Sequence, residues 1–69
     1  MPTIGEKRVR PEHRELTSEE KSQIEAIKTK TAELIDLCES LKSKDGRLAS
    51  LAQTSYEEAC FWGVKAITA

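Results

Sequence analysis

The residues best suited to chemistry in this sequence are one histidine and a few cations. His13 and Arg14 stand just before the first predicted helix, and Lys28 lies just over three turns into it, beside Ile24 and Ile27. The stem of Lys28 therefore borders an apolar stripe while its ammonium can reach across an interface. An imidazole and a lysine from neighbouring subunits would suit a small ligand with bases to stack and phosphates to pair. The alternative is a solvated lysine.

The same residue types argue against catalysis. The chain has one histidine, no nucleophile placed beside a base and no glycine-rich phosphate loop, so it lacks the groups of acid–base and nucleophilic catalysis. Cys38 and Cys60 are the only cysteines and give no zinc-site spacing. They are either buried thiols in a reducing cytoplasm, the interpretation we favour, or a bridge between facing helices. The sequence thus predicts a non-enzymatic protein without metal or cofactor.

Charge and size narrow the possible partners. With 11 Lys and Arg against 12 Asp and Glu, the chain has no electrostatic footprint for duplex nucleic acid. Single-stranded nucleic acid is also disfavoured, because the aromatic residues lie in an apolar helix rather than in the basic arm. No apolar run approaches the ~20 residues of a membrane span. Ordering so short a chain costs roughly 100 kcal/mol, which two helices alone do not offset, so we expect it to oligomerise.

The elements that must position these residues begin with an extended arm over residues 1–16, which contains Pro2, Gly5 and Pro11. A helix is predicted over residues 17–42. Thr17 and Glu20 have the spacing of a capping box at its start. Its apolar stripe steps by three and four residues through Ile24, Ile27, Thr31, Leu34, Cys38 and Leu41.

A turn over residues 43–46 and a second helix over residues 47–68 follow, so we predict an all-α antiparallel hairpin. Gly63 marks either a close crossing of the helices or a glycine tolerated within the second helix. The seam predicted to face the first helix comprises Leu48, Ala52, Ser55, Ala59, Trp62 and Ala66. A second apolar face is left over, which a second copy of the chain would cover. The residues predicted for that oligomer interface are Tyr56, Cys60, Phe61, Trp62, Val64 and Ile67.

Short motifs run in order from His13 to Thr68 and carry a family resemblance. The first group is His13-Arg14-Glu15-Leu16-Thr17-Ser18-Glu19-Glu20, then Ile27-Lys28 and Glu33-Leu34. The second is Arg47, Ala49-Ser50-Leu51-Ala52 and Thr54, then Glu58-Ala59-Cys60-Phe61-Trp62-Gly63-Val64-Lys65-Ala66-Ile67-Thr68. Together they resemble the aromatic-RELS/T-x-EE, IK, EL and EA-x-x-W-x-x-K-A-I-T segments of the anti-CBASS sponges, small phage proteins whose helical-hairpin domain is shared with anti-Thoeris sponges.

This resemblance implies a phage immune-evasion protein in the cytoplasm of the infected bacterial host. Such a protein holds cyclic oligonucleotide messengers, such as the cyclic dinucleotide cGAMP, without cleaving them, so that the CBASS effector is never activated. It also implies a compact homohexamer with cyclic dinucleotides between paired subunits and, in some members, cyclic trinucleotides in separate three-fold pockets.

Carried over by position, the base-stacking aromatic of the family matches His13 and the phosphate-pairing lysine matches Lys28. The family commonly has tyrosine at the first position, so His13 is a departure that leaves less area for stacking. Arg14 and Lys30 are secondary phosphate contacts by proximity. Arg10 and Lys65 are candidates for a second, trinucleotide site.

A reading from a different class remains open. The chain could be a small helical oligomerisation module that binds a host or phage protein through the face between Tyr56 and Ile67. That reading predicts no stabilisation by any small molecule, whereas the sponge reading predicts selective stabilisation by one class of cyclic nucleotide.

Overall fold

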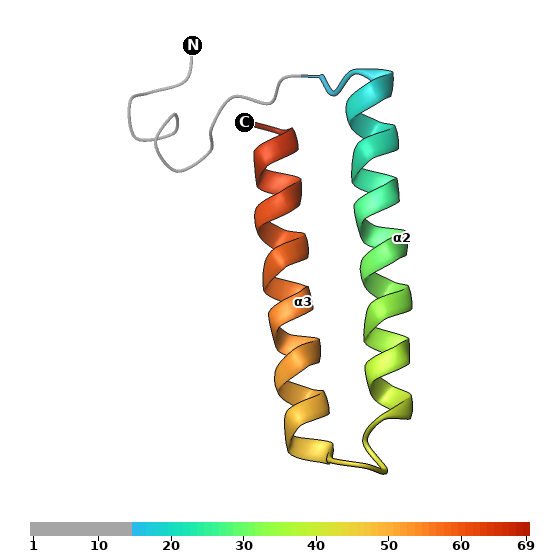
Figure 1. Ribbon diagram of the computed structural model, residues 1–69. Coiled ribbons are helices and arrows are strands. Elements are labelled where there is room, and N and C mark those ends of the chain that lie inside the picture. Colours follow the sequence, from blue (N-terminus) through green and yellow to red (C-terminus); the bar gives the residue numbers. More distant parts are fainter. Residues whose placement is uncertain (1–14) are drawn as a thin grey trace, which may run out of the picture.

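The computed structural model describes residues 15–69 as two helices packed side by side in opposite directions (Figure 1). Helix α2 spans Ser18–Ser40 and helix α3 spans Gly46–Ile67. No strand occurs in this part of the chain. The all-α hairpin predicted from the sequence is therefore confirmed. Of the arm predicted over residues 1–16, residues 1–14 lie outside the described residues.

Helix α2 begins where the capping signal places it. The Glu20 amide donates to the Thr17 hydroxyl at 3.1 Å, and the Thr17 amide donates to the Glu20 carboxylate at 2.9 Å. These reciprocal bonds satisfy amides that a helix start otherwise leaves unpaired. The helix ends at Ser40 with Leu41 as its cap, two residues before the predicted end at 42.

The connection is short and locally hydrogen-bonded. The amides of Lys44 and Asp45 both donate to the Leu41 carbonyl, at 2.9 and 3.2 Å. The Asp45 carboxylate then accepts from the Leu48 amide at 2.9 Å and caps α3. Gly46 is consequently the first residue of α3 rather than the last of the turn, and α3 ends at Ile67 with Thr68 as its cap.

The two helices approach closely at Gly63, which is the first of the two interpretations that the sequence left open. A Cβ at this position would lie 3.1 Å from Cδ1 of Ile27 on α2, tighter than ordinary van der Waals contact. Glycine lets the backbones come together here, at its usual cost in helix stability. This contact fixes the level at which the helices meet, with Ile27 opposite Gly63.

The predicted facing of α3 is wrong. The predicted seam, which includes Leu48 and Trp62, lies largely on the outside: these two side chains are 61% and 63% exposed, and of its six members Ala52 alone is half-buried. The side of α3 that meets α2 is the other stripe, which we call the inner face of α3. It consists of Ala49, Gln53, Tyr56, Cys60, Gly63, Val64 and Ile67, which are buried or half-buried.

The physical reason for this reversal lies in side-chain size. Two stripes with apolar residues run along α3, and the one with Ala49 and Gly63 turns toward α2. Alanine and glycine on the inner face allow a close approach, whereas Leu48 and Trp62 at the same places would push the helices apart.

The hairpin has little interior of its own. Among residues 15–69 only Cys38 and Ala49 are buried. Both cysteines are free thiols, Cys38 buried and Cys60 half-buried. The structure therefore has thiols at these positions and not the disulfide between facing helices. Neither α2 nor α3 contains a stretch long and apolar enough to cross a membrane.

Candidate functional site

Lys28 projects from the side of α2 that also carries Glu39. The two residues are eleven positions apart, which is about three full turns of an α-helix, so their directions around the helix axis differ by about 20° only. Lys28 is exposed and directly follows Ile27, so it stands at the level of Gly63 on α3. Its ammonium has no hydrogen-bond or ion-pair partner among residues 15–69. A cation with this placement is free to pair with a phosphate.

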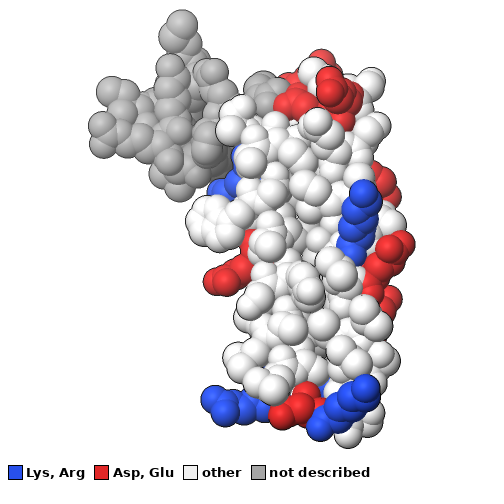
Figure 2. Space-filling model, in the orientation of Figure 1, with Lys and Arg blue, Asp and Glu red and all other residues white. Residues whose placement is uncertain are grey.

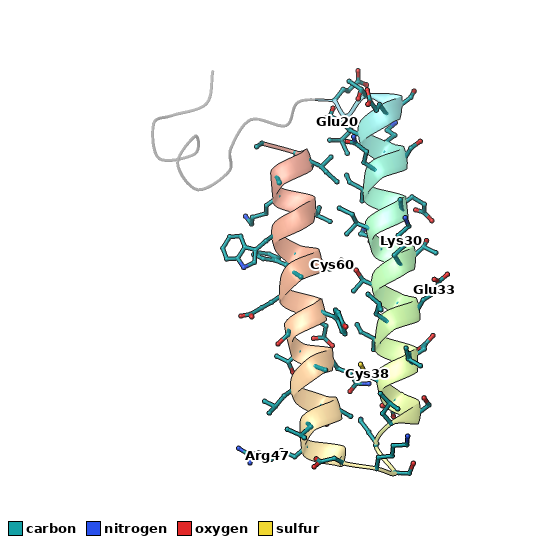
Figure 3. All side chains as sticks on the ribbon, in the orientation of Figure 1. Glu20, Lys30, Glu33, Cys38, Arg47 and Cys60 are labelled. Carbon is teal, nitrogen blue, oxygen red and sulfur yellow. The ribbon has the colours of Figure 1, made fainter. Side chains whose placement is uncertain are left out.

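Lys30 is not brought together with Lys28. Two residues along a helix are separated by about 200° around its axis, so the two ammonium groups leave opposite sides of α2. Lys30 points toward the viewer in Figure 3 and borders a hollow of about 270 Å³ in the groove between the helices. The other lining residues of this hollow are Ile27, Thr31, Leu34, Tyr56, Ala59 and Cys60.

Two carboxylates, those of Glu25 and Glu33, share a second hollow with Lys30. A shallow hollow of about 650 Å³ on α2 is lined by Lys30 together with Lys21, Glu25 and Glu33. Nearby carboxylates lower the positive potential at Lys30. Glu25 also lies three positions, about one turn, before Lys28, so a carboxylate stands near each of the two lysines.

Lys65 lies against an exposed aromatic pair on α3. Its Nζ is 5.1 Å from the centroid of the Phe61 ring, a cation–π contact. Phe61 and Trp62 meet edge to face, with ring centroids 5.2 Å apart and an interplanar angle of 73°. An ammonium held over an aromatic ring remains available to an anion, so Lys65 stays a candidate for the second site.

Three predicted ligand residues, Arg10, His13 and Arg14, lie outside the described residues. The arm that carries them joins α2 through Leu16, which is half-buried, and Thr17, which caps the helix. The cap fixes where the chain enters α2, about three turns before Lys28.

The six residues predicted for an oligomer interface divide into two groups. Phe61 and Trp62 are exposed at 54% and 63%. Tyr56, Cys60, Val64 and Ile67 are half-buried and belong to the inner face of α3, so they already have neighbours within the hairpin. Their assignment to a contact between copies stays a prediction.

Gln53 is the residue that sequence reasoning missed. Its Nε2 donates to the Ile35 carbonyl at 3.1 Å and to the Glu39 carboxylate at 2.9 Å, so one amide ties α3 to α2. The available signal was its spacing, four residues after Ala49 and three before Tyr56, which places a polar group within the inner face.

Glu39 is held as a carboxylate by two donors. The Lys42 ammonium lies 2.8 Å from its Oε2, and Gln53 donates to the same oxygen. The hydrogen bond from Lys42, then that from Gln53, then the charge of Lys42 hold the pKa of Glu39 below its ordinary value of 4.5. This side of the hairpin is consequently polar and hydrogen-bonded.

Metal binding finds no support in the described region. No three side chains of the His, Cys, Asp and Glu types gather there. The chemistry available in residues 15–69 is therefore that of exposed cations, one partly exposed groove and an aromatic pair.

Comparison with known proteins gives one match. The model of a family described as Acb2/Tad1, hairpin domain, matches residues 5–68, which is nearly the whole chain. Searches of curated proteins and of solved structures found no match.

Proposed function

Because the chain belongs to the Acb2/Tad1 hairpin family, we propose that it is a phage anti-defence sponge for cyclic oligonucleotide messengers. It holds cyclic dinucleotides such as cGAMP, with cyclic trinucleotides as a second class, and breaks no bond in them. The messenger then never activates the CBASS effector in the cytoplasm of the infected bacterium. Sequestration of this kind requires tight binding and slow release only.

The observation that carries the proposal is the free cation at Lys28. It is exposed and has no partner among the described residues, and it lies about three turns after Thr17, where the chain that bears His13 enters α2. An ammonium pairs with a phosphate of the messenger, and the imidazole stacks on a base. Both groups are supplied by residues inside the matched region 5–68.

The opposite directions of the two lysines of α2 favour a ligand pocket between copies of the chain. Lys28 and Lys30 leave opposite sides of the helix, so one ligand contacts both only if different copies supply them. This argument favours the homo-oligomer, a hexamer in the resemblance described above, with Arg14 and Lys30 as secondary contacts. Arg10 and Lys65 are left for a separate trinucleotide pocket.

The decisive experiment is thermal unfolding of the purified protein with a panel of cyclic and linear di- and trinucleotides. At 100-fold excess over the dissociation constant, a bound messenger stabilises the native state by about 2.7 kcal/mol. We expect one class of cyclic nucleotide to raise the melting temperature and its linear counterpart to leave it unchanged. The Lys28→Ala variant should lose this rise, whereas Lys44→Ala, at the turn, should keep it.

Two outcomes would overturn the proposal. If no nucleotide raises the melting temperature, the protein-binding module becomes the better reading, although four residues of its face between Tyr56 and Ile67 already pack toward α2. If Lys28→Ala lowers the oligomer mass in size-exclusion chromatography with light scattering, Lys28 is structural and the site is elsewhere.

A further inference from the structure

Phe61 is an exposed aromatic residue of α3 to which the family resemblance gives no part in ligand binding. Lys65 lies over its ring, with Nζ 5.1 Å from the centroid, and Trp62 meets it edge to face. The side chain is nevertheless 54% exposed. A ring that stays this open after two contacts can still receive a planar ligand.

Phe61 lies on the same side of the hairpin as Lys28. Lys30 of α2 and Ala59 of α3 border one hollow in the groove between the helices, so these two share a side. Lys28 is two residues from Lys30, and Phe61 is two residues from Ala59. Two residues turn about 200° around a helix axis. Lys28 and Phe61 therefore both point away from that hollow, onto the polar side of the hairpin that carries Glu39.

The two residues also stand at nearly the same height along the helix pair. Ile27 of α2 lies opposite Gly63 of α3. Lys28 is one residue after Ile27, and Phe61 is two residues before Gly63. Because the helices are antiparallel, both displacements lead toward the turn. At a rise of about 1.5 Å per residue, Lys28 and Phe61 therefore differ in height by about 1.5 Å.

The opposite side of the hairpin offers a poorer combination of ring and cation. Figure 2 shows that side, toward which Lys30 points in Figure 3, and uncharged residues cover most of its middle. Tyr56 borders a hollow there together with Lys30. Tyr56 is half-buried, however, and belongs to the inner face of α3. The more open ring is that of Phe61, which lies with Lys28 on the polar side.

The charges around the two residues suit different parts of a nucleotide. Glu57 lies one turn before Phe61 on α3 and Lys65 one turn after it, and both are exposed. These opposite charges nearly cancel at the ring, which favours an uncharged base there. Lys28 is an exposed ammonium, and no ion pair joins it to Glu25, one turn before it on α2. A phosphate is favoured at Lys28.

We propose that Phe61 is a base-stacking residue of the messenger site, with a base on its ring and a phosphate of the same ligand on Lys28 of the same copy. The inference rests on the proposed sponge function and adds a contact from α3 to it. Packed helices lie about 8–10 Å apart, and a nucleotide bridges the two side chains across that gap. The stacking on Phe61 also offsets the smaller stacking area of an imidazole at His13.

Trp62 reports on this contact in solution, because it is the only tryptophan and its ring centroid is 5.2 Å from that of Phe61. A base on Phe61 changes the surroundings of the indole. The experiment titrates the full chain with cGAMP, cyclic di-AMP and cyclic di-GMP in parallel, by calorimetry and by tryptophan emission. We expect the emission to change in proportion to the fraction of protein that calorimetry finds bound.

Two variants of one position separate stacking from a structural role. Phe61→Leu removes the ring but keeps a large apolar side chain, and the loss of one stacked base should weaken affinity about 5- to 150-fold. Phe61→Tyr keeps the ring and is the matched control, which should retain the affinity of the natural protein. Both variants should keep the oligomer mass of the natural protein in light scattering.

Three results would overturn the stacking role and leave the sponge function standing. The first is binding without any change in Trp62 emission, and the second is equal affinity in Phe61→Leu and the natural protein. The third is a lower oligomer mass in Phe61→Leu, which would place the ring between copies. No binding of any of the three nucleotides to the natural protein would instead overturn the sponge function for cyclic dinucleotides. The emission titration needs no variant, so it tests the proposal even if a substitution unfolds the hairpin.

Discussion

The two sides of α3 differ in how exposed their large apolar side chains are. The inner face combines Tyr56, Val64 and Ile67 with the small residues Ala49, Cys60 and Gly63 and the polar Gln53, all buried or half-buried. The outer side carries Leu48, Leu51 and Trp62, which are 61%, 54% and 63% exposed. Three of the largest apolar side chains of α3 therefore face away from α2, whereas small residues on the inner face let the two helices approach.

This difference teaches that the two sides of α3 contribute differently to the hairpin. The inner face sets its geometry through the contact of Gly63 with Ile27 and the bonds of Gln53. The outer side of α3 carries apolar area that stays open to solvent in the hairpin. Variants on the inner face should therefore change the stability of the hairpin more than variants on the outer side.

Gly63→Leu is the change that should damage the inner face most. A Cβ alone would lie 3.1 Å from Ile27, so a leucine must push the helices apart. Overpacking costs about 1–3 kcal/mol and outweighs the regained helix propensity of up to about 1 kcal/mol, so we expect a net loss of up to about 2 kcal/mol. Thermal unfolding followed by circular dichroism would record a loss of about 2 kcal/mol as a fall of about 8–16 °C, and a smaller loss in proportion.

Ala66→Leu is the matched control for that change, because it enlarges an exposed residue on the outer side of α3. It should leave the melting temperature unchanged or raise it. If both variants lose equal stability, the two sides of α3 do not differ in the way described.

Gln53→Ala should have a smaller effect. It removes the donor that bonds the Ile35 carbonyl and the Glu39 carboxylate, which we expect to cost about 1 kcal/mol. Urea unfolding at fixed protein concentration measures the loss. Gln23→Ala, at an exposed glutamine of α2, is the control, and an equal loss in both variants would mean that the cross-helix bonds contribute nothing.

Acid should produce the smallest effect, on the polar side of the hairpin. The pKa of Glu39 is held below its ordinary value of 4.5, first by the Lys42 hydrogen bond. A carboxyl with a depressed folded pKa contributes stability that is complete above the unfolded pKa and lost as pH falls through the folded one. Melting temperature measured from about pH 6 down to about pH 3 should therefore fall less steeply in Glu39→Gln than in the natural protein.

A parallel slope in the two proteins would show that Glu39 is not tied to Lys42 and Gln53 in solution. Glu33→Gln, elsewhere on α2, serves as the control and should keep the slope of the natural protein.

The sequence predicted best what depends on neighbouring residues. The capping box of Thr17 and Glu20 and the helix ends to within two residues follow from local hydrogen bonding. The close crossing at Gly63 was one of two interpretations, because a glycine within a helix costs stability but can also simply be tolerated.

Which side of α3 faces α2 could not be predicted in the same way. Periodicity reveals stripes but gives no rotation of one helix about its axis relative to another. That rotation depends on the connection from Leu41 to Asp45 and on side-chain sizes on both helices. The divergence of Lys28 and Lys30, by contrast, could be predicted from the sequence, because residues two positions apart on a helix do not share a side. The placement of His13 relative to Lys28 stays a prediction.

The antiparallel course of the hairpin also determines how it responds to mechanical load. Residue 15 and the C-terminus lie at the same end of the helix pair (Figure 1). Tension between them acts across the groove at one end, so the contacts near Ile67 carry it first and those near Gln53 later. Such a pair unzips turn by turn under low force, whereas helices pulled from opposite ends would have to slide past each other with all their contacts loaded together.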